Sequence, residues 1–315
     1  MKSLPWQLSN LRLPAIAAPM FIVSSPELVI AQCKQGIVGS MPALNARPAG
    51  ALDEWLTRIE NELAAWDAAN PQTPAAPFAI NLILHKSNTR LQEDLEVLRK
   101  HKVPIVITSL GAQKEINDAV QSWGGITLHD VINDRFARKA IEKGADGLIA
   151  VAAGAGGHGG QWSPFALVQE IRAWFDGPLV LSGAIATGQS ILAAQAMGAD
   201  LAYLGSLFIA AEEANAPQTY KQAIVDSGAA DIIYSDLFTG VLGNYLRASI
   251  VNAGLDPDNL PARDKGVVIA DAAKPWRDIW GAGQGVGAVK AIRPVSIIVD
   301  QLKREYHFAR DRLAL

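Results

Sequence analysis

The chain has 315 residues, of which 50% are hydrophobic and 19% charged, a composition that suits one large globular domain or two smaller ones. A net charge of −3 offers no basic surface for nucleic acid or for an acidic membrane. The first ten residues do not read as a signal peptide, and no apolar run reaches the ~18 residues needed to span a bilayer, so we expect a cytoplasmic protein. The single cysteine, Cys33, excludes an intrachain disulfide and a cysteine-rich metal site, and we expect it to fill the core.

Strand and helix signals alternate along the chain. The short apolar runs that predict strands are 14–20, 37–41, 78–84, 105–110, 126–131, 147–152, 179–182 and 201–204. The amphipathic segments that predict helices are 28–33, 52–66, 88–101, 113–123, 133–143, 164–175 and 187–197. Eight strands alternating with helices favour a (β/α)8 TIM barrel over a doubly wound sheet.

A glycine-rich stretch, 151–161, follows the sixth predicted strand and precedes a helix that begins at Pro164. We therefore predict that it is a loop. Its five glycines would let the backbone approach a ligand closely. His158 lies in the middle, and an imidazole with an ordinary pKa near ~6.5 is well suited to move a proton at neutral pH. The alternative is a solvated loop with an incidental surface histidine.

Chemistry on a (β/α)8 barrel is expected where the strands end. The candidate residues at the ends of the first six strands are Ala18, Pro19, Met20, Asn81, Thr108, His129 and Ala153. The turns after the seventh and eighth strands contain Ser182, Gly183, Ala184, Leu204, Gly205 and Ser206. Backbone N–H groups and hydroxyls in such turns, next to a helix N-terminus, favour an anion such as phosphate, with ordinary loop glycines as the alternative.

The pattern changes after the eighth strand. Helical stretches at 217–226 and 245–252 are followed by a Pro- and Asp-rich segment, 256–265, a glycine-rich run, and a long C-terminal helix at 294–312. We expect a barrel formed by residues 1–211 and 281–315. A smaller, mostly helical lobe, 212–280, would be inserted after the eighth strand and would cover the barrel mouth.

Several of these motifs together resemble the FMN-dependent nitronate monooxygenases, formerly called 2-nitropropane dioxygenases, which are related to the FMN-type enoyl-ACP reductases. The resemblance covers nearly the whole chain. It rests on Ala18-Pro19-Met20, Ala155-Gly156-Gly157-His158-x-Gly160, Ser182-Gly183, Leu204-Gly205-Ser206, Phe238-Thr239-Gly240 with Asn244 and Leu246-Arg247, and Ala282-Gly283-Gln284-Gly285-x-Gly287.

The resemblance implies that FMN lies across the barrel mouth, with its phosphate at the turns after the seventh and eighth strands. Met20 and Asn81 would approach the flavin ring, Gly157 would lie beside it, and Gln284 would reach it from the second lobe. His158 would take the acidic proton of a nitroalkane, and dioxygen would complete the oxidation to a carbonyl compound and nitrite. The other implied FMN-binding residues are Ala18, Pro19, Thr108, His129, Ala153, Ser182, Gly183, Ala184, Leu204, Gly205 and Ser206.

Some positions depart from the family pattern, and alternatives stay open. Gly154 stands where many relatives have glutamate, Ala184 replaces a glycine and Leu207 replaces a frequent arginine. His129 is equally compatible with a purely structural hydrogen bond. The alternatives in function are an NAD(P)H-dependent flavin reductase acting on quinones or enoyl thioesters, and a non-catalytic flavin-binding sensor. A homodimer is compatible with the sequence.

Overall fold

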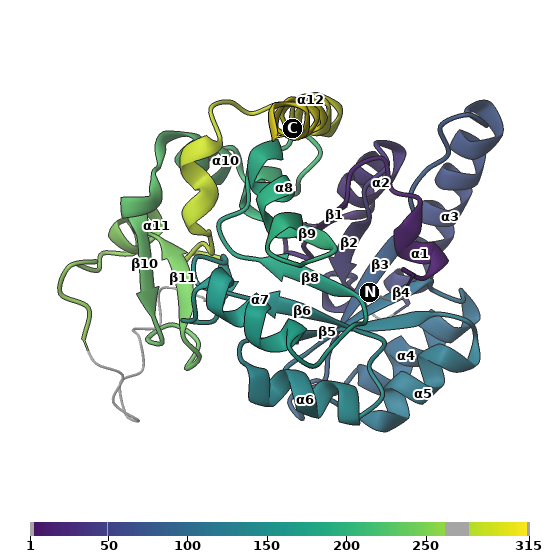
Figure 1. Cartoon of the computed structure of the whole chain (residues 1–315). Helices are drawn as coiled ribbons and strands as arrows, with labels where there is room; N and C mark the ends of the chain where they lie inside the picture. The colour runs from purple at the N-terminus through teal and green to yellow at the C-terminus, as the bar shows by residue number, and fades with distance from the viewer. Residues whose placement is uncertain (1–2, 49, 262–276, 314–315) are drawn as a thin grey trace.

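The protein contains a closed barrel of parallel strands (Figure 1). The computed structural model describes residues 3–48, 50–261 and 277–313. The barrel strands are β1 (Ala15–Ala17), β2 (Gly39–Pro42), β3 (Phe78–Ile83), β4 (Ile105–Ser109), β5 (Ile126–Val131), β6 (Gly147–Val151), β8 (Leu179–Ser182) and β9 (Leu201–Leu204). Their order is β1-β9-β8-β6-β5-β4-β3-β2, and a parallel bridge between Ile16 and Val38 joins the two ends. The predicted (β/α)8 barrel is confirmed.

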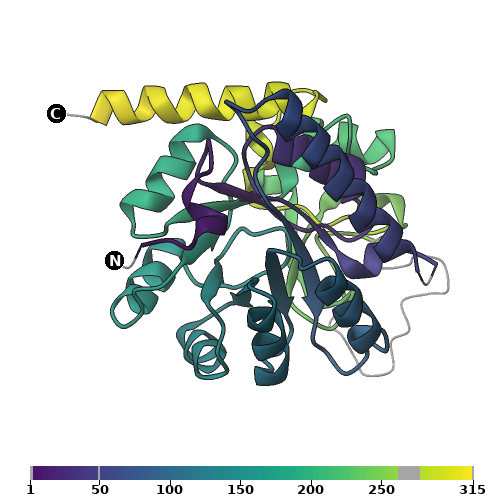
Figure 2. The same cartoon turned by 90° about the vertical axis from the view of Figure 1, so that its right-hand side faces the viewer.

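Helices between the strands cover the outside of the barrel (Figure 2). They are α2 (Pro26–Lys34), α3 (Ala51–Ala69), α4 (Leu91–Lys100), α5 (Lys114–Ser122), α6 (Asp134–Glu142), α7 (Pro164–Arg172) and α8 (Gly188–Ala196). Asn133 caps α6 through its side chain, as its sequence position predicts, and Thr187 caps α8. The short helices α1 (Trp6–Ser9), η1 (Ala43–Asn45) and α9 (Ser206–Ile209) were not predicted. No helix in the described ranges has the length and hydrophobicity needed to cross a membrane.

Each barrel strand is buried on both faces, which explains why the strands are continuous apolar runs. In β6, Ile149 and Val151 pack inside the barrel, whereas Leu148 and Ala150 pack against the surrounding helices. Cys33 is fully buried as core filler, and burial raises the pKa of its thiol to about 12. Successive residues of one strand therefore alternate between the barrel interior and the layer of surrounding helices, and the same alternation continues to the C-terminal ends of the strands.

The C-terminal helix α12 (Val295–Leu313) lies along the outside of the barrel against α8 (Figures 1 and 2). Gly188 permits the close approach, because a methyl group there would overlap the backbone at Leu302 and Tyr306. The Tyr306 hydroxyl donates a hydrogen bond to Gln195 Oε1 at 2.6 Å, and the Gly188 N–H donates to the Glu305 carboxylate at 2.8 Å. Tyr306 is thus a packing residue.

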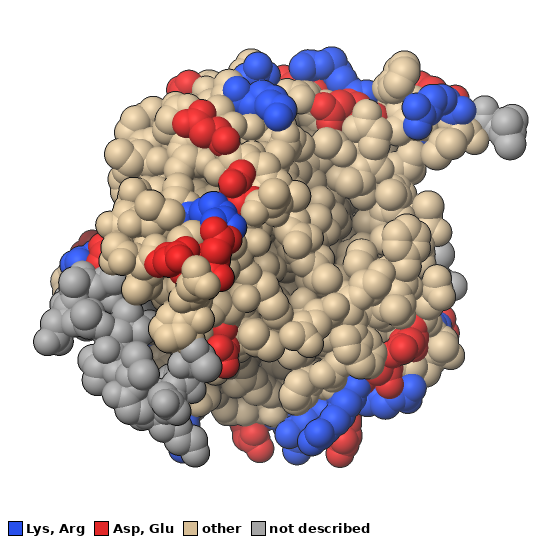
Figure 3. Space-filling model, turned by 90° about the vertical axis from the view of Figure 1, so that its left-hand side faces the viewer, with Lys and Arg blue, Asp and Glu red and all other residues tan. Residues whose placement is uncertain are grey.

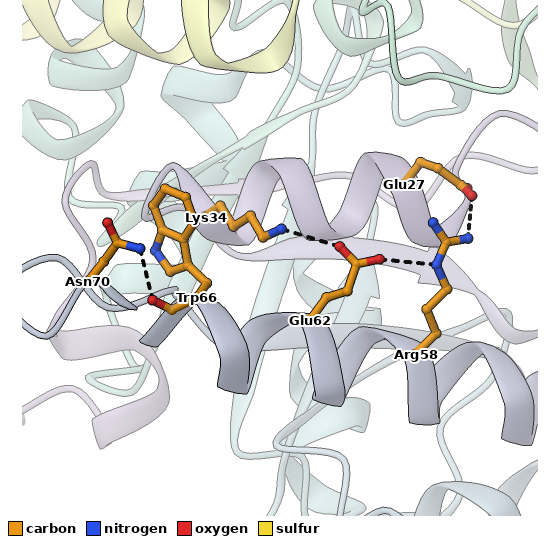
Figure 4. A network of polar contacts seen from close by, with 6 residues as sticks. All are labelled: Glu27, Lys34, Arg58, Glu62, Trp66 and Asn70. Atoms are coloured by element: carbon orange, nitrogen blue, oxygen red, sulfur yellow. Dashed lines mark hydrogen bonds and ion pairs between the residues drawn. The ribbon is translucent and has the colours of Figure 1, made fainter. Parts of the chain in front are cut away.

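Helices α2 and α3 share a polar network on the surface (Figure 4). The Glu62 carboxylate accepts hydrogen bonds from Lys34 at 3.3 Å and from Arg58 at 3.2 Å, and Arg58 also pairs with Glu27. The Lys34 ammonium lies 5.8 Å from the centre of the Trp66 ring. Because these groups are partly exposed, each ion pair contributes at most about 1 kcal/mol, and the buried apolar contacts between the helices dominate.

A second, three-stranded sheet stands at the barrel mouth. It contains β10 (Ile232–Ser235), β11 (Gly243–Leu246) and the two-residue strand β7 (Gly157–His158), in the order β10-β11-β7. The other elements of this region are α10 (Gln218–Asp226), η2 (Ala229–Asp231), α11 (Arg247–Asn252) and η3 (Gln284–Ala288). The β10–β11 hairpin was not predicted. The helix expected from residue 245 starts at Arg247, because the preceding residues pair with β10. The division of the chain into a barrel and a lobe inserted at 212–280 stays a prediction.

Candidate functional site

The C-terminal ends of the barrel strands enclose a cavity of about 890 Å³. Figure 3 shows a hollow in this face whose walls are mostly uncharged. A volume of this size fits a large cofactor together with a small substrate. The predicted site residues that line it are Ala18, Pro19, Met20, Asn81, His129, Gly157, His158, Ser182, Gly183, Ala184, Gly205 and Ser206.

The remaining predicted site residues do not line the cavity. Thr108 and Leu204 are fully buried in the barrel wall. The Ala153 N–H donates to the Trp162 carbonyl at 2.8 Å, so this residue closes the base of the loop. Gln284 contacts the loop through its backbone, because its N–H donates to the Gly154 carbonyl at 2.9 Å.

His158 is held in the cavity wall by a strand and by a side-chain hydrogen bond. The prediction of a loop throughout 151–161 was wrong at Gly157 and His158, which form β7 and pair with Asn244 and Gly243 of β11. His158 Nε2 lies 2.9 Å from the Thr239 hydroxyl oxygen. Burial lowers the pKa of His158 below its ordinary value of 6.5, because the charged imidazolium loses solvation. The imidazole is therefore neutral at pH 7 and able to accept a proton.

The β10–β11 connection and β11 supply contacts that the sequence reasoning did not assign. The Thr239 hydroxyl also lies 3.1 Å from the Tyr245 hydroxyl, and Asn244 Nδ2 donates to the Ala155 carbonyl at 2.6 Å. Asn244 is 3% exposed. The family motif contained Thr239 and Asn244 but not Tyr245, and a separation of 81 positions between His158 and Thr239 leaves no local signal for their pairing.

The two glycine-rich segments interlock by their backbones. A methyl group at Gly156 would lie 2.7 Å from the Gly283 nitrogen, and one at Gly283 would lie 2.6 Å from the Gly154 oxygen. Side chains cannot occupy these positions without moving one segment. The Gly283 N–H donates to the Ser206 hydroxyl at 2.8 Å, so the late glycine run connects the His158 loop with the turn after β9.

The turns after β8 and β9 have amides that a phosphate group would satisfy. The N–H groups of Gly183, Gly205 and Ser206 make no hydrogen bond to any described residue. Ala184, which replaces a family glycine, keeps the left-handed conformation with φ of 54°. Such a backbone costs an alanine about 1 kcal/mol relative to glycine, and a conformation retained at this cost is typical of functional turns.

The N-terminus of the helix after β8 is largely engaged within the fold. The Gly188 N–H donates to the Glu305 carboxylate, and the Ser190 N–H donates to the Thr187 hydroxyl. A carboxylate at this end would also repel a second anion. The α8 terminus therefore packs against α12, and the anion site at the two turns stays a prediction.

Strand alternation separates His129 from the polar groups inside the barrel. The Thr108 hydroxyl and His129 Nδ1 lie 2.6 Å apart on neighbouring strands, and His129 is 5% exposed. Burial lowers the pKa of His129 to about 4, so it is neutral at pH 7. The next residues, Ser109 and Asp130, point to the opposite face of the sheet and into the barrel. We predicted His129 as a site residue from the sequence, but not its neighbour Asp130.

Comparison with known proteins identifies the family. The family model described as "Nitronate monooxygenase" matches residues 2–304. The chain is 27% identical to the nitronate monooxygenase of Paraburkholderia phytofirmans, over 93% of this chain and 92% of that protein. FabK from Thermotoga maritima superimposes with a TM-score of 0.78 at 23% identity, covering 98% of this chain and 96% of FabK.

A nitroalkane oxidase from Streptomyces ansochromogenes superimposes with a TM-score of 0.76 at 24% identity, covering 97% of this chain and 99% of that chain. At this level of identity the two structures show a shared fold. The family model spans most of the chain and therefore also shows the family. This protein is an oxidoreductase that belongs to the nitronate monooxygenase family.

Proposed function

We propose that this enzyme uses FMN to oxidise alkyl nitronates and nitroalkanes with dioxygen, giving carbonyl compounds and nitrite. The coarser assignment, a flavoprotein oxidoreductase, follows from the family. The single observation that supports oxidation of nitronates and nitroalkanes in particular is the neutral imidazole of His158 in the wall of a largely uncharged cavity.

FMN binding is supported by the chemistry of the two turns after β8 and β9. The amides of Gly183, Gly205 and Ser206 would donate to the phosphate, and Asn81 and Gly157 at the cavity wall would adjoin the ring. When bound, FMN supplies the two-electron acceptor that amino-acid side chains lack.

His158 has the properties of the base. The carbon next to a nitro group is acidic, and a neutral imidazole within reach can remove its proton. The Thr239 hydroxyl and the pairing of β7 with β11 restrict how the ring can turn, which keeps one nitrogen directed consistently. Walls with few charges exclude water from the reacting carbon and favour the neutral form of the base.

The experiment is anaerobic mixing of the FMN-loaded protein with ethyl nitronate and, separately, with NADH, while the flavin absorbance is followed. We expect ethyl nitronate alone to bleach the flavin and air to restore the colour with release of nitrite. Bleaching by NADH alone would instead identify a flavin reductase acting on quinones or enoyl thioesters. Bleaching by neither compound would reject both enzymatic functions and leave a flavin-binding sensor.

A further inference from the structure

Five large apolar side chains that line the cavity are also exposed to solvent. They are Leu110 after β4, Ile132 after β5, Phe136 in the first turn of α6, and Val241 and Leu242 in the β10–β11 connection. Each is between 38% and 46% exposed. We call these five residues the apolar collar. Single exposed apolar residues are common on protein surfaces, but a group of them along one cavity is typical of a site for an apolar ligand.

The collar adjoins the chain segment that carries His158. In the second sheet, His158 pairs with the residue that follows Leu242. The Leu242 carbonyl accepts a hydrogen bond from the Gly159 N–H at 3.4 Å. A methyl group at Gly160 would lie 3.3 Å from Ile132 Cβ, so this part of the collar also contacts the loop. The collar is therefore a continuation of the cavity wall next to the candidate base, and not a separate patch of the surface.

Leu110 occupies its place in the collar with an unfavourable backbone conformation. Its φ is 61°, in the left-handed region that residues with a bulky side chain avoid. At 46% exposure, the leucine side chain gains little from burial that would offset this cost. A strained backbone that presents an apolar side chain to a cavity is typical of a position that contacts a ligand.

The collar is separate from the turns that we expect to hold the phosphate of FMN. Those turns follow β8 and β9, whereas the collar lies after β4 and β5 and in the β10–β11 connection, and β6 stands between β8 and β5 in the barrel. None of the collar residues is among those expected to bind FMN. Lys139 and His85 also line the cavity, but both are exposed, so their polar ends stay in water. The collar is therefore available to a part of the substrate that has no charge.

We propose that the apolar collar binds the hydrocarbon tail of the substrate, so that the enzyme prefers straight-chain nitronates and nitroalkanes longer than nitroethane. The reacting end would lie at His158, and the tail would extend along Ile132 and Leu242 towards Leu110 and Phe136. The identity of the reacting end rests on the proposed function, whereas the tail site is tested with unreactive ligands. Because the tail is the same in the ground state and in the transition state, its contacts lower KM and leave kcat unchanged.

The probes are the straight-chain primary amides from propanamide to hexanamide. A carboxamide has the planar shape of a nitro group and carries no charge, so Lys139 does not attract it. Calorimetric titration of the FMN-loaded protein measures the dissociation constant of each amide. We expect this constant to fall about fourfold with each added methylene, since each methylene is removed from water. In turnover, KM should fall by the same factor from nitroethane to 1-nitropentane at constant kcat.

The decisive variant is Leu110→Asn. Asparagine is close to leucine in size and adopts a positive φ more readily, so the fold should be retained while the apolar surface is lost. We expect hexanamide to bind about 4- to 15-fold more weakly than to the wild type, the value of one or two methylenes, and propanamide to bind equally well. Leu242→Asn should act in the same way. The control is Ile297→Asn on α12, which removes a side chain that is 45% exposed and does not line the cavity, and it should change neither constant. Circular dichroism and flavin content report folding.

Each outcome decides the inference. Dissociation constants that do not change with chain length would overturn it, as would a wild-type ratio of hexanamide to propanamide affinity in Leu110→Asn. If Leu110→Asn does not fold, the same ratio in Leu242→Asn decides. An altered oligomeric state of the variant in analytical ultracentrifugation, at an unchanged ratio, would instead identify the collar as a contact between copies of this chain. Bleaching by ethyl nitronate without chain-length dependence would reject the tail site and leave the proposed function intact. Chain-length dependence that the collar variants lose, without bleaching, would support the tail site and reject the proposed function.

Discussion

Replacing Thr239 by valine tests whether the hydrogen bond to His158 positions the base. Valine keeps the shape of threonine and removes the hydroxyl that lies 2.9 Å from His158 Nε2 and 3.1 Å from the Tyr245 hydroxyl. A lost hydrogen bond of this kind costs about 1 to 3 kcal/mol when a buried polar partner is left behind. If the whole cost appears in the transition state, turnover falls about 5- to 150-fold.

Two substrates separate a positioning role from general damage. Neutral nitroethane needs removal of a carbon proton, whereas preformed ethyl nitronate does not. We therefore expect Thr239→Val to lose kcat/KM on nitroethane by the stated factor and to keep most of its activity on ethyl nitronate, with unchanged FMN content. Stopped-flow reduction of the flavin under anaerobic conditions measures both rates directly.

A matched control is Thr57→Val on α3. The Thr57 hydroxyl is exposed and donates to the Asp53 carbonyl at 2.9 Å, and neither residue lines the cavity. Its loss should leave both rates unchanged. If Thr239→Val retains the wild-type ratio of nitroethane to nitronate activity, the hydroxyl contributes nothing to proton removal and does not position His158.

The remaining predictions concern the base and two close backbone contacts. His158→Ala should lower kcat/KM on nitroethane about 100-fold or more while FMN stays bound, and retained turnover would remove His158 from the mechanism. In the wild type, the pH–rate profile on nitroethane should fall to half of its maximum below pH 6.5, because burial lowers the pKa of His158 and protonation abolishes the base; a midpoint above pH 6.5 would contradict this. Gly156→Ala should weaken FMN binding at least several-fold in fluorescence titrations, since a methyl group would push the 282–283 backbone away. Gly188→Ala should destabilise the fold by about 1 to 3 kcal/mol in urea unfolding, because it overpacks α8 against α12. For both glycine variants the control is Gly287→Ala, where the nearest atom would be 3.8 Å away, and equal effects in variant and control would reject the steric argument.

Local sequence patterns were sufficient for the barrel. The strands are buried on both faces, so each is an apolar run that stands out between amphipathic helices, and the predicted strand 126–131 coincides with β5. Cap residues such as Asn133 place helix ends within a residue or two. The lobe was harder to predict from the sequence, because the pairing of β10 with β11 leaves a weaker local pattern. As a result, the β11 residues Tyr245 and Leu246 were assigned to a helix.

The amino-acid sequence by itself determined the (β/α)8 architecture, the glycine-rich loop with its histidine, and the family, since each is encoded in short-range pattern or motif. Only the tertiary structure decided which groups meet. Thr239 reaches His158 across 81 positions, and Glu305 of α12 occupies the helix terminus that the sequence suggested for phosphate. Successive side chains of a strand point to opposite faces of the sheet, so His129 points outward and Asp130 points into the barrel. Only the tertiary structure shows which face of β5 lines the barrel interior.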